Sequence, residues 1–352
     1  METIAREDLV PQGCCVDLHV HHELPVFGPF LARSLHRLPP AHAETEGCGV
    51  LGYALYTWSF PTRRAGAAEI LSMVRRLRAR AARPLITDGA SLRSHLAGGR
   101  GTAGFLCLEG LRFLDDPSSL EALVRAGVVA VQPVHFWDNA YAHSYRFGLV
   151  PVSEVGLTGL GRELLCEIER LGLLLDLAHM NRATMDEVLA RFRGPVLCSH
   201  TGLTSLRETT RNLPDAIASE IFRRGGLVGV TPWRRLLPRF RGTGLAAWND
   251  AFVRTVEALV ALGGEHGVAL GSDRGAPLLV PPSFLAPPNV AQLQRVLESS
   301  TGIIGLGEAL FGGNAVRFLL QQVPVRSQCQ EYYHGGPRCR KLPTITTSRD
   351  RC

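Results

Sequence analysis

Short apolar runs rich in β-branched residues recur along most of this chain. Eight of them can be marked, and they cover roughly residues 14–20, 48–57, 102–109, 128–135, 173–179, 195–200, 226–231 and 267–273. Most of these runs are apolar at consecutive rather than alternate positions, a pattern typical of strands that are covered on both faces. The pattern therefore predicts a buried, mainly parallel sheet.

Helical patterns lie between most of the runs. Apolar residues recur at spacings of three and four over residues 65–82, 117–126, 159–171, 182–192, 214–224 and 246–262. This spacing predicts helices that bury one face. Alternating strands and helices indicate an α/β fold, and eight strands in about 260 residues fit a (β/α)8 TIM-type barrel better than the alternative, an open doubly wound sheet.

Two more helices are predicted after the last strand, over residues 288–299 and 306–322, where they would cap or flank the barrel. We expect residues 1–323 to form one barrel domain. Residues 324–352 are polar, basic and without periodicity, so we expect a disordered tail there. Residues 22–46, rich in proline, histidine and leucine, predict a long loop over the mouth of the barrel.

The composition is that of a soluble globular enzyme, with 45% hydrophobic and 20% charged residues. Most of the net charge of +6 lies in the tail, because residues 326–352 hold six basic and two acidic residues. No basic stripe with interleaved aromatic residues is evident, so we expect no nucleic-acid partner. The chain has neither a long apolar run nor the apolar core of a signal peptide near Met1, so we expect no membrane span and a cytoplasmic location.

Side chains that can bind a metal ion stand at the ends of six of the eight apolar runs. In a barrel the carboxyl ends of the strands meet at one face, and catalysis takes place there. We therefore expect seven such side chains to converge: His19, His21, Glu109, His135, His179, His200 and Asp273.

Imidazole and carboxylate groups together suit Zn²⁺ or another first-row divalent ion. The number of candidate ligands exceeds the need of one tetrahedral ion, so two ions are expected, and two ions require an anionic bridge between them. A carbamylated lysine is excluded because Lys341, the single lysine, lies in the tail, which leaves Glu109 as the natural bridge. A hydroxide shared by both ions would be the nucleophile at neutral pH.

One long stretch and several shorter motifs follow one another in a specific order. The stretch runs from Gly156-Leu157-Thr158 through Gly161-Arg162-Glu163-Leu164 to Asp176-Leu177-Ala178-His179. The shorter motifs are Leu108-Glu109-Gly110, Val134-His135, Ser199-His200, Arg211-Asn212-Leu213-Pro214-Asp215 and Phe311-Gly312-Gly313-Asn314. This set, over roughly residues 14–320, resembles the renal or membrane dipeptidase family, peptidase family M19. The resemblance implies a barrel with a binuclear zinc site that hydrolyses dipeptides.

For the metal site, the resemblance implies that His19 and the residue two positions further on bind one ion, with Glu109 as the bridge. It implies that His179 and His200 bind the other ion. The family usually has aspartate where this chain has His21. The imidazole keeps a ligand but removes one negative charge, which makes the core of the site more positive. The His-x-His pair also resembles the wider amidohydrolase superfamily.

For the substrate, the resemblance implies that Arg211 pairs with the terminal carboxylate, to which a guanidinium fork is suited. His135 would stabilise the oxyanion of the tetrahedral intermediate. Asp273 would contact the first ion or its hydroxide and pass a proton to the leaving amine. Members of the family form dimers, which makes a homodimer an expectation for this chain, although its sequence identifies no interface.

Two other functions stay open at this point. A barrel phosphodiesterase or deoxyribonuclease would use similar histidine and carboxylate ligands, but no phosphate-binding basic cluster is evident, and such an enzyme would leave the ordered motifs unexplained. A non-catalytic descendant that binds a metal ion or a partner is supported only by the departure at His21. A zinc-dependent dipeptidase with a small dipeptide substrate is the leading hypothesis.

Overall fold

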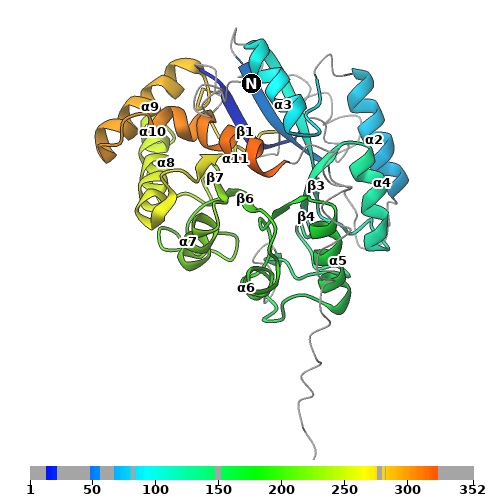
Figure 1. The fold of residues 1–352 in the computed structure, drawn as a ribbon. Coiled ribbons are helices and arrows are strands. Elements are labelled where there is room, and N and C mark those ends of the chain that lie inside the picture. The colour runs from blue at the N-terminus through cyan, green and yellow to red at the C-terminus, as the bar shows by residue number, and fades with distance from the viewer. Residues whose placement is uncertain are drawn as a thin grey trace, which may run out of the picture.

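The computed structural model describes residues 13–21, 48–55, 67–80, 84–146, 152–275, 280–281 and 283–323. The loop expected over residues 22–46 and the tail expected over residues 324–352 lie outside this part. Eight strands close into a barrel in chain order (Figure 1): β1 (Cys15–Val20), β2 (Cys48–Leu55), β3 (Gly101–Glu109), β4 (Val128–Gln132), β5 (Leu174–Asp176), β6 (Val196–Thr201), β7 (Leu227–Val230) and β8 (Val268–Leu270).

All neighbouring strands are parallel, including β8 and β1, which pair through Leu270 and Asp17. Every residue of β4 to β8 is buried, as is every residue of β3 except Gly101. Burial on both faces explains the continuous apolar runs. The closed barrel confirms the predicted fold and excludes the open doubly wound sheet.

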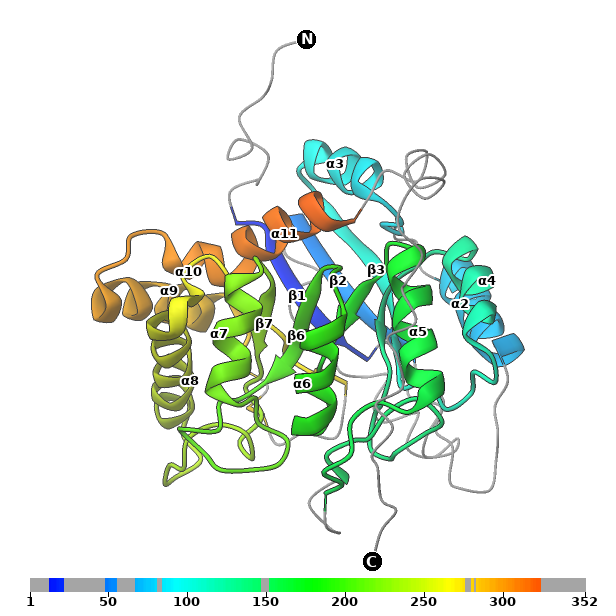
Figure 2. The same ribbon diagram turned by 60° about the horizontal axis from the view of Figure 1, so that its bottom comes forward.

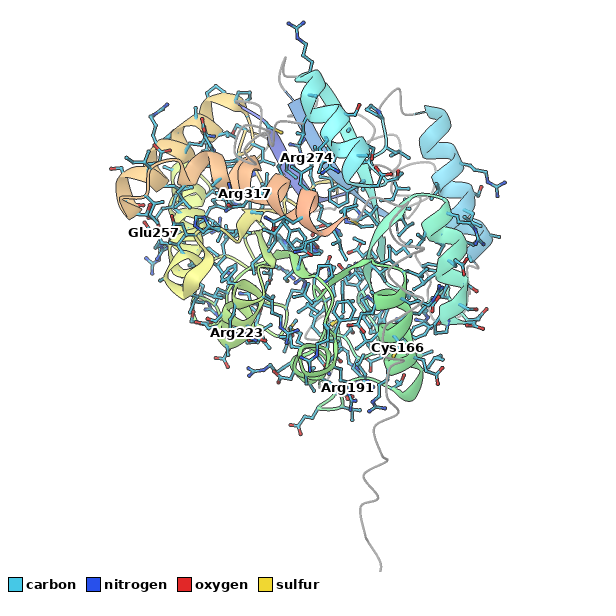
Figure 3. The ribbon with its side chains drawn as sticks, in the orientation of Figure 1. Cys166, Arg191, Arg223, Glu257, Arg274 and Arg317 are labelled. Atoms are coloured by element: carbon cyan, nitrogen blue, oxygen red, sulfur yellow. The ribbon has the colours of Figure 1, made fainter. Side chains whose placement is uncertain are left out.

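Helices surround the barrel (Figures 1 and 2), and their bounds are α2 (Ala67–Arg80), α3 (Gly89–Gly98), α4 (Leu120–Arg125), α5 (Gly159–Arg170), α6 (Arg182–Arg191), α7 (Asp215–Arg223), α8 (Leu245–Leu259), α9 (Pro287–Thr301), α10 (Leu306–Glu308) and α11 (Asn314–Gln322). The shorter helical segments are η3 (Pro117–Ser119), η5 (Val260–Gly264) and η6 (Ala309–Gly313). Charged side chains such as Arg191 and Arg223 lie on the outer side of this ring (Figure 3). None of the described helices is long and apolar enough to cross a membrane.

The amino-terminal end of the barrel is closed by α11, as expected for a capping helix (Figure 2). Val316 and Leu319 of this helix belong to the same apolar cluster as Val16 of β1 and Val50 of β2. The helix also contacts α3. Because this end is filled with apolar side chains, the carboxyl ends of the strands form the accessible mouth.

One helix, α3, was not predicted from the sequence. Its buried side chains are only Leu92 and Leu96, too few for a recognisable apolar stripe. The residues that mark this helix in the sequence are those at its two ends. Asp88 forms a capping box with Ser91, and Gly99 ends the helix at a φ of 64°, which suits glycine.

Candidate metal centre

The seven side chains predicted from strand ends lie together at the mouth of the barrel. Their positions along the elements are His19 in β1, His21 directly after it, Glu109 at the end of β3, His135 after β4, His179 after β5, His200 in β6 and Asp273 after β8. His135 and Asp273 keep 17% and 13% of their side chains exposed, whereas the other five are almost fully buried. The mouth of the site therefore opens beside His135 and Asp273.

Glu109 is the hub of this group. Its Oε1 lies 3.4 Å from Nε2 of His19, 3.3 Å from Nε2 of His135 and 3.5 Å from Nε2 of His179. Its Oε2 lies 3.8 Å from Nε2 of His21. One buried carboxylate thus faces four imidazoles that come from three other strand ends.

Two more contacts extend the group on either side of Glu109. Nε2 of His21 is 3.0 Å from Oδ1 of Asp273, and Nε2 of His179 is 2.9 Å from Nε2 of His200. Two imidazole nitrogens at this distance cannot both carry a proton toward each other, but both lone pairs can face one cation. The contacts therefore add Asp273 to the group beside His21, and His200 beside His179.

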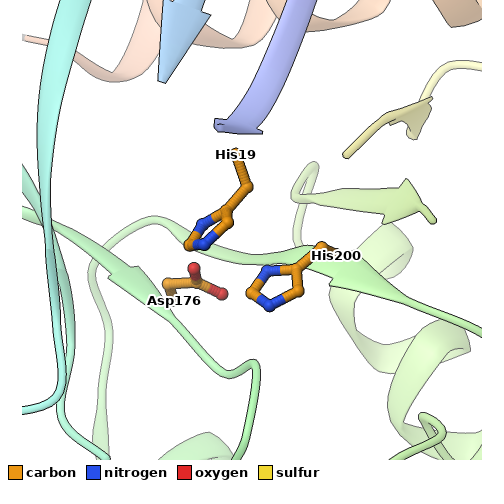
Figure 4. A group of neighbouring side chains, drawn as sticks. All are labelled: His19, Asp176 and His200. Atoms are coloured by element: carbon orange, nitrogen blue, oxygen red, sulfur yellow. The ribbon is translucent and has the colours of Figure 1, made fainter. Parts of the chain in front are cut away.

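The donor atoms of the site fit a metal ion. Ligand atoms within 4.8 Å of one another occur in three groups of described residues: His19, Asp176 and His200 (Figure 4); His19, His21 and Asp273; and Glu109, His135 and His179. Nε2 of His19 and Oε2 of Glu109 are buried and accept or donate no hydrogen bond. Such groups are costly to bury uncompensated, and a divalent cation would satisfy both.

Electrostatics set the protonation of these groups in the metal-free chain. Burial favours the neutral form of Glu109, but His135, His19 and His21 outweigh it and hold the Glu109 pKa well below its usual range. Burial also opposes charge on His19, but the Glu109 carboxylate raises the His19 pKa to about 9. Burial lowers the pKa of His135 to about 4 and is the largest cause that holds the pKa of His179 well below its usual value. The last two are therefore neutral at pH 7, the form of imidazole that binds metal.

Two buried aspartates support the site and were not singled out from the sequence. Oδ1 of Asp17 accepts hydrogen bonds from the N–H groups of Ser272 (2.8 Å) and His19 (3.3 Å). Oδ1 of Asp176 accepts from the N–H of Ser199 at 2.9 Å and from that of the residue two positions after itself at 3.0 Å. Burial raises the pKa of both carboxyl groups. Each aspartate fixes the backbone beside candidate ligands on two neighbouring strands.

Two of the candidate ligands have unusual backbone conformations. The φ angles of His179 and Asp273 are 66° and 54°, in the left-handed region that non-glycine residues rarely occupy. Their conformations are held by hydrogen bonds from Tyr145 N to His179 O and from Asp273 N to His19 O, both 3.0 Å long. Backbone strain of this kind concentrates at functional sites, where surrounding structure holds a side chain in position.

Arg211 lies buried beside the cluster. Its Nη2 donates to the carbonyl oxygen of His200 at 2.8 Å, and its guanidinium lies 5.7 Å from the centre of the Tyr145 ring. Among the described residues no carboxylate forms an ion pair with Arg211. The Tyr145 ring packs edge-on against His179, with 5.3 Å between ring centres. Tyr145, which the sequence did not indicate, therefore lies against both Arg211 and His179.

The loop after β4, which carries His135 and Tyr145, is braced by Asp138. Its carboxylate accepts hydrogen bonds from Ser144 N at 2.9 Å and from Arg146 Nε at 3.0 Å, and pairs with His143 Nδ1 at 2.8 Å. Burial opposes the charge of Asp138, but the hydrogen bonds, chiefly from Arg146, lower its pKa to about 2. The loop is thus held against the barrel mouth by an ionised side chain.

The fold and the cluster define a barrel protein with a histidine and carboxylate centre at its strand ends. The model of the membrane dipeptidase family, peptidase family M19, matches residues 47–332, and the chain belongs to this family. It is 31% identical over 169 residues to an uncharacterized dipeptidase of Schizosaccharomyces pombe. That match spans 48% of this chain and 40% of the length of that relative.

Solved structures share the fold. The metallopeptidase dipeptidase AC of family M19 has a TM-score of 0.69 and 23% identity, over 90% of this chain and 100% of its own. A metallopeptidase from Rhodobacter sphaeroides, liganded with a phosphinate mimic of the dipeptide L-Ala-D-Ala, has a TM-score of 0.68 and 22% identity, over 89% and 99% of the two chains. At these identities the likeness establishes the architecture alone.

Proposed function

We propose that this protein is a metal-dependent dipeptidase that uses two divalent ions, Zn²⁺ in the first instance. The observation that carries the proposal is the buried Glu109 carboxylate, which faces four imidazoles beside the buried Arg211, a guanidinium with no ion pair to any described carboxylate. Membership of the dipeptidase family supports the same conclusion.

In this proposal Glu109 would hold both ions, because its two oxygens face different histidines. His19, His21 and Asp273 would hold one ion, and His179 and His200 would hold the other. When bound, the ions would lower the pKa of a water molecule and polarise the peptide carbonyl, which is the chemistry that peptide hydrolysis needs.

The chain's own side chains would supply the remaining steps. Arg211 would bind the terminal carboxylate of the dipeptide, since its guanidinium is buried and no described carboxylate pairs with it. His135 would donate a hydrogen bond from its ring to the oxyanion, which a neutral imidazole can do. Asp273, at the open side of the site, would take the proton of the attacking water on its carboxylate and pass it to the leaving amine.

A direct assay distinguishes dipeptide hydrolysis from the competing activity, the cleavage of phosphodiesters. Purified protein with added Zn²⁺ is offered L,L and L,D dipeptides and, separately, bis-p-nitrophenyl phosphate. We expect amino acids to be released from dipeptides, with little or no cleavage of the phosphodiester. Phosphodiester cleavage without dipeptide cleavage would contradict the proposal. The Glu109→Gln protein, purified in the same way, controls for contaminating peptidases.

A further inference from the structure

Four arginines from two neighbouring loops come together on the same side of the barrel as the metal centre. Arg207 lies between β6 and α7, whereas Arg234, Arg235 and Arg239 lie between β7 and α8. Nη1 of Arg207 donates to the carbonyl oxygen of Arg234 at 2.9 Å and to that of Leu237 at 3.3 Å. Both loops follow the carboxyl ends of their strands, so this arginine cluster lies on the rim of the barrel mouth.

The positive charge of the cluster is not neutralised by the described residues. None of its four arginines forms an ion pair with a described carboxylate, and Glu208, next to Arg207, is exposed and forms none either. Burial and the charges of Arg239, Arg235 and Arg234 lower the pKa of Arg207. Gathering like charges in this way costs folding free energy, and an anion bound among them would reduce that cost.

Part of the cluster is held rigidly and part is free to reach a ligand. The guanidinium of Arg234 donates to the carbonyl oxygens of Gly242 (2.6 Å) and Phe240 (2.9 Å), and it lies 4.3 Å from the centre of the Phe240 ring. Arg235 and Arg239 are exposed. The fixed arginines thus set a positive potential, and the exposed ones can contact an anion directly.

The arginine cluster adjoins the stretch of backbone that carries Arg211. Asn212, the next residue, is buried, and its Nδ2 donates to the carbonyl oxygens of Arg207 at 2.8 Å and Leu236 at 2.9 Å. These bonds tie both arginine-bearing loops to the backbone beside Arg211. If Arg211 binds the terminal carboxylate of a dipeptide, a second anionic group on the same residue of that dipeptide would therefore lie near the arginine cluster.

We infer that the arginine cluster binds a second anionic group on the C-terminal residue of the substrate, so that dipeptides ending in an acidic residue are preferred. This inference rests on the proposed dipeptidase function, with Arg211 as the partner of the terminal carboxylate. Along the chain the arginines between 234 and 241 are interleaved with apolar residues, and only folding brings Arg207 to them. The structure thus corrects the expectation from the sequence that no basic cluster is present.

The test compares kcat/KM for Ala-Glu and for the uncharged, isosteric Ala-Gln, in L,L and L,D forms. We expect the native protein at low ionic strength to prefer Ala-Glu about tenfold. In the double variant Arg235→Gln/Arg239→Gln, and in high salt, the preference should fall to about twofold while Ala-Gln cleavage is unchanged. The matched control is Arg193→Gln. Arg193 is exposed and comes shortly before β6, at the amino-terminal end of the barrel, so this variant should keep the full preference for Ala-Glu.

Each outcome decides the inference. Equal kcat/KM for the two dipeptides in the native protein would overturn the acidic subsite and leave the dipeptidase function intact. A preference that persists in the double variant would place the selectivity elsewhere and would also overturn it. Failure to cleave either dipeptide would overturn the proposed function and the inference with it.

Discussion

Replacing Glu109 with glutamine is expected to lower kcat/KM for a dipeptide by about 10³-fold or more and to reduce the bound metal to fewer than two ions per chain. Glutamine has nearly the same shape, but it removes the charge that faces His19, His135, His179 and His21. A neutral amide can neither balance two cations nor bridge them. Metal analysis and steady-state kinetics on the same preparation measure both effects.

The matched control is Glu163→Gln, because Glu163 is an exposed glutamate on α5 and is not one of the candidate ligands. It should leave both the metal content and kcat/KM unchanged. Circular dichroism of Glu109→Gln should show the native helix content, which separates a loss of metal from a loss of fold. An unchanged kcat with a full complement of metal would show that Glu109 is not the bridge.

Replacing Arg211 with alanine is expected to raise KM for dipeptides about 10²-fold, with a smaller effect on kcat, because a buried charge-assisted pair with the terminal carboxylate is lost. A dipeptide whose carboxylate is amidated should be a poor substrate of the native protein and should lose little more in the variant. Kinetics on the free and amidated forms of one dipeptide measure this difference.

Arg211 also donates to the carbonyl oxygen of His200, so the alanine variant could disturb a candidate ligand. Arg211→Lys keeps the charge but loses the planar fork, and its KM should lie between those of the native and alanine proteins. An equal loss of activity on the free and amidated dipeptides would contradict the carboxylate-binding role.

Much of the fold could be predicted from the sequence because a barrel strand is buried on both faces. Each predicted run overlaps an observed strand, and the differences are a few residues at the ends, as between 173–179 and Leu174–Asp176. Burial extends past the last paired residue, so an apolar run is longer than its strand: Leu177 and Ala178 are buried yet follow β5.

The candidate ligands could be predicted because barrel topology places strand ends together whatever the loops do. The supporting residues could not all be found this way. Asp17 and Asp176 had a readable signal, an acidic residue inside an apolar run. Tyr145 and the arginine cluster had none, because they depend on how non-periodic loops pack against each other.

The central claim is that dipeptide hydrolysis depends on ions bound at the Glu109 centre. The most direct test strips the protein with a chelator, adds Zn²⁺ in steps and follows both the bound metal and the initial rate of dipeptide hydrolysis. We expect no hydrolysis in the stripped protein and a rate that rises to a plateau at about two ions per chain. Hydrolysis that persists in the stripped protein, or none at any metal load, would contradict the claim.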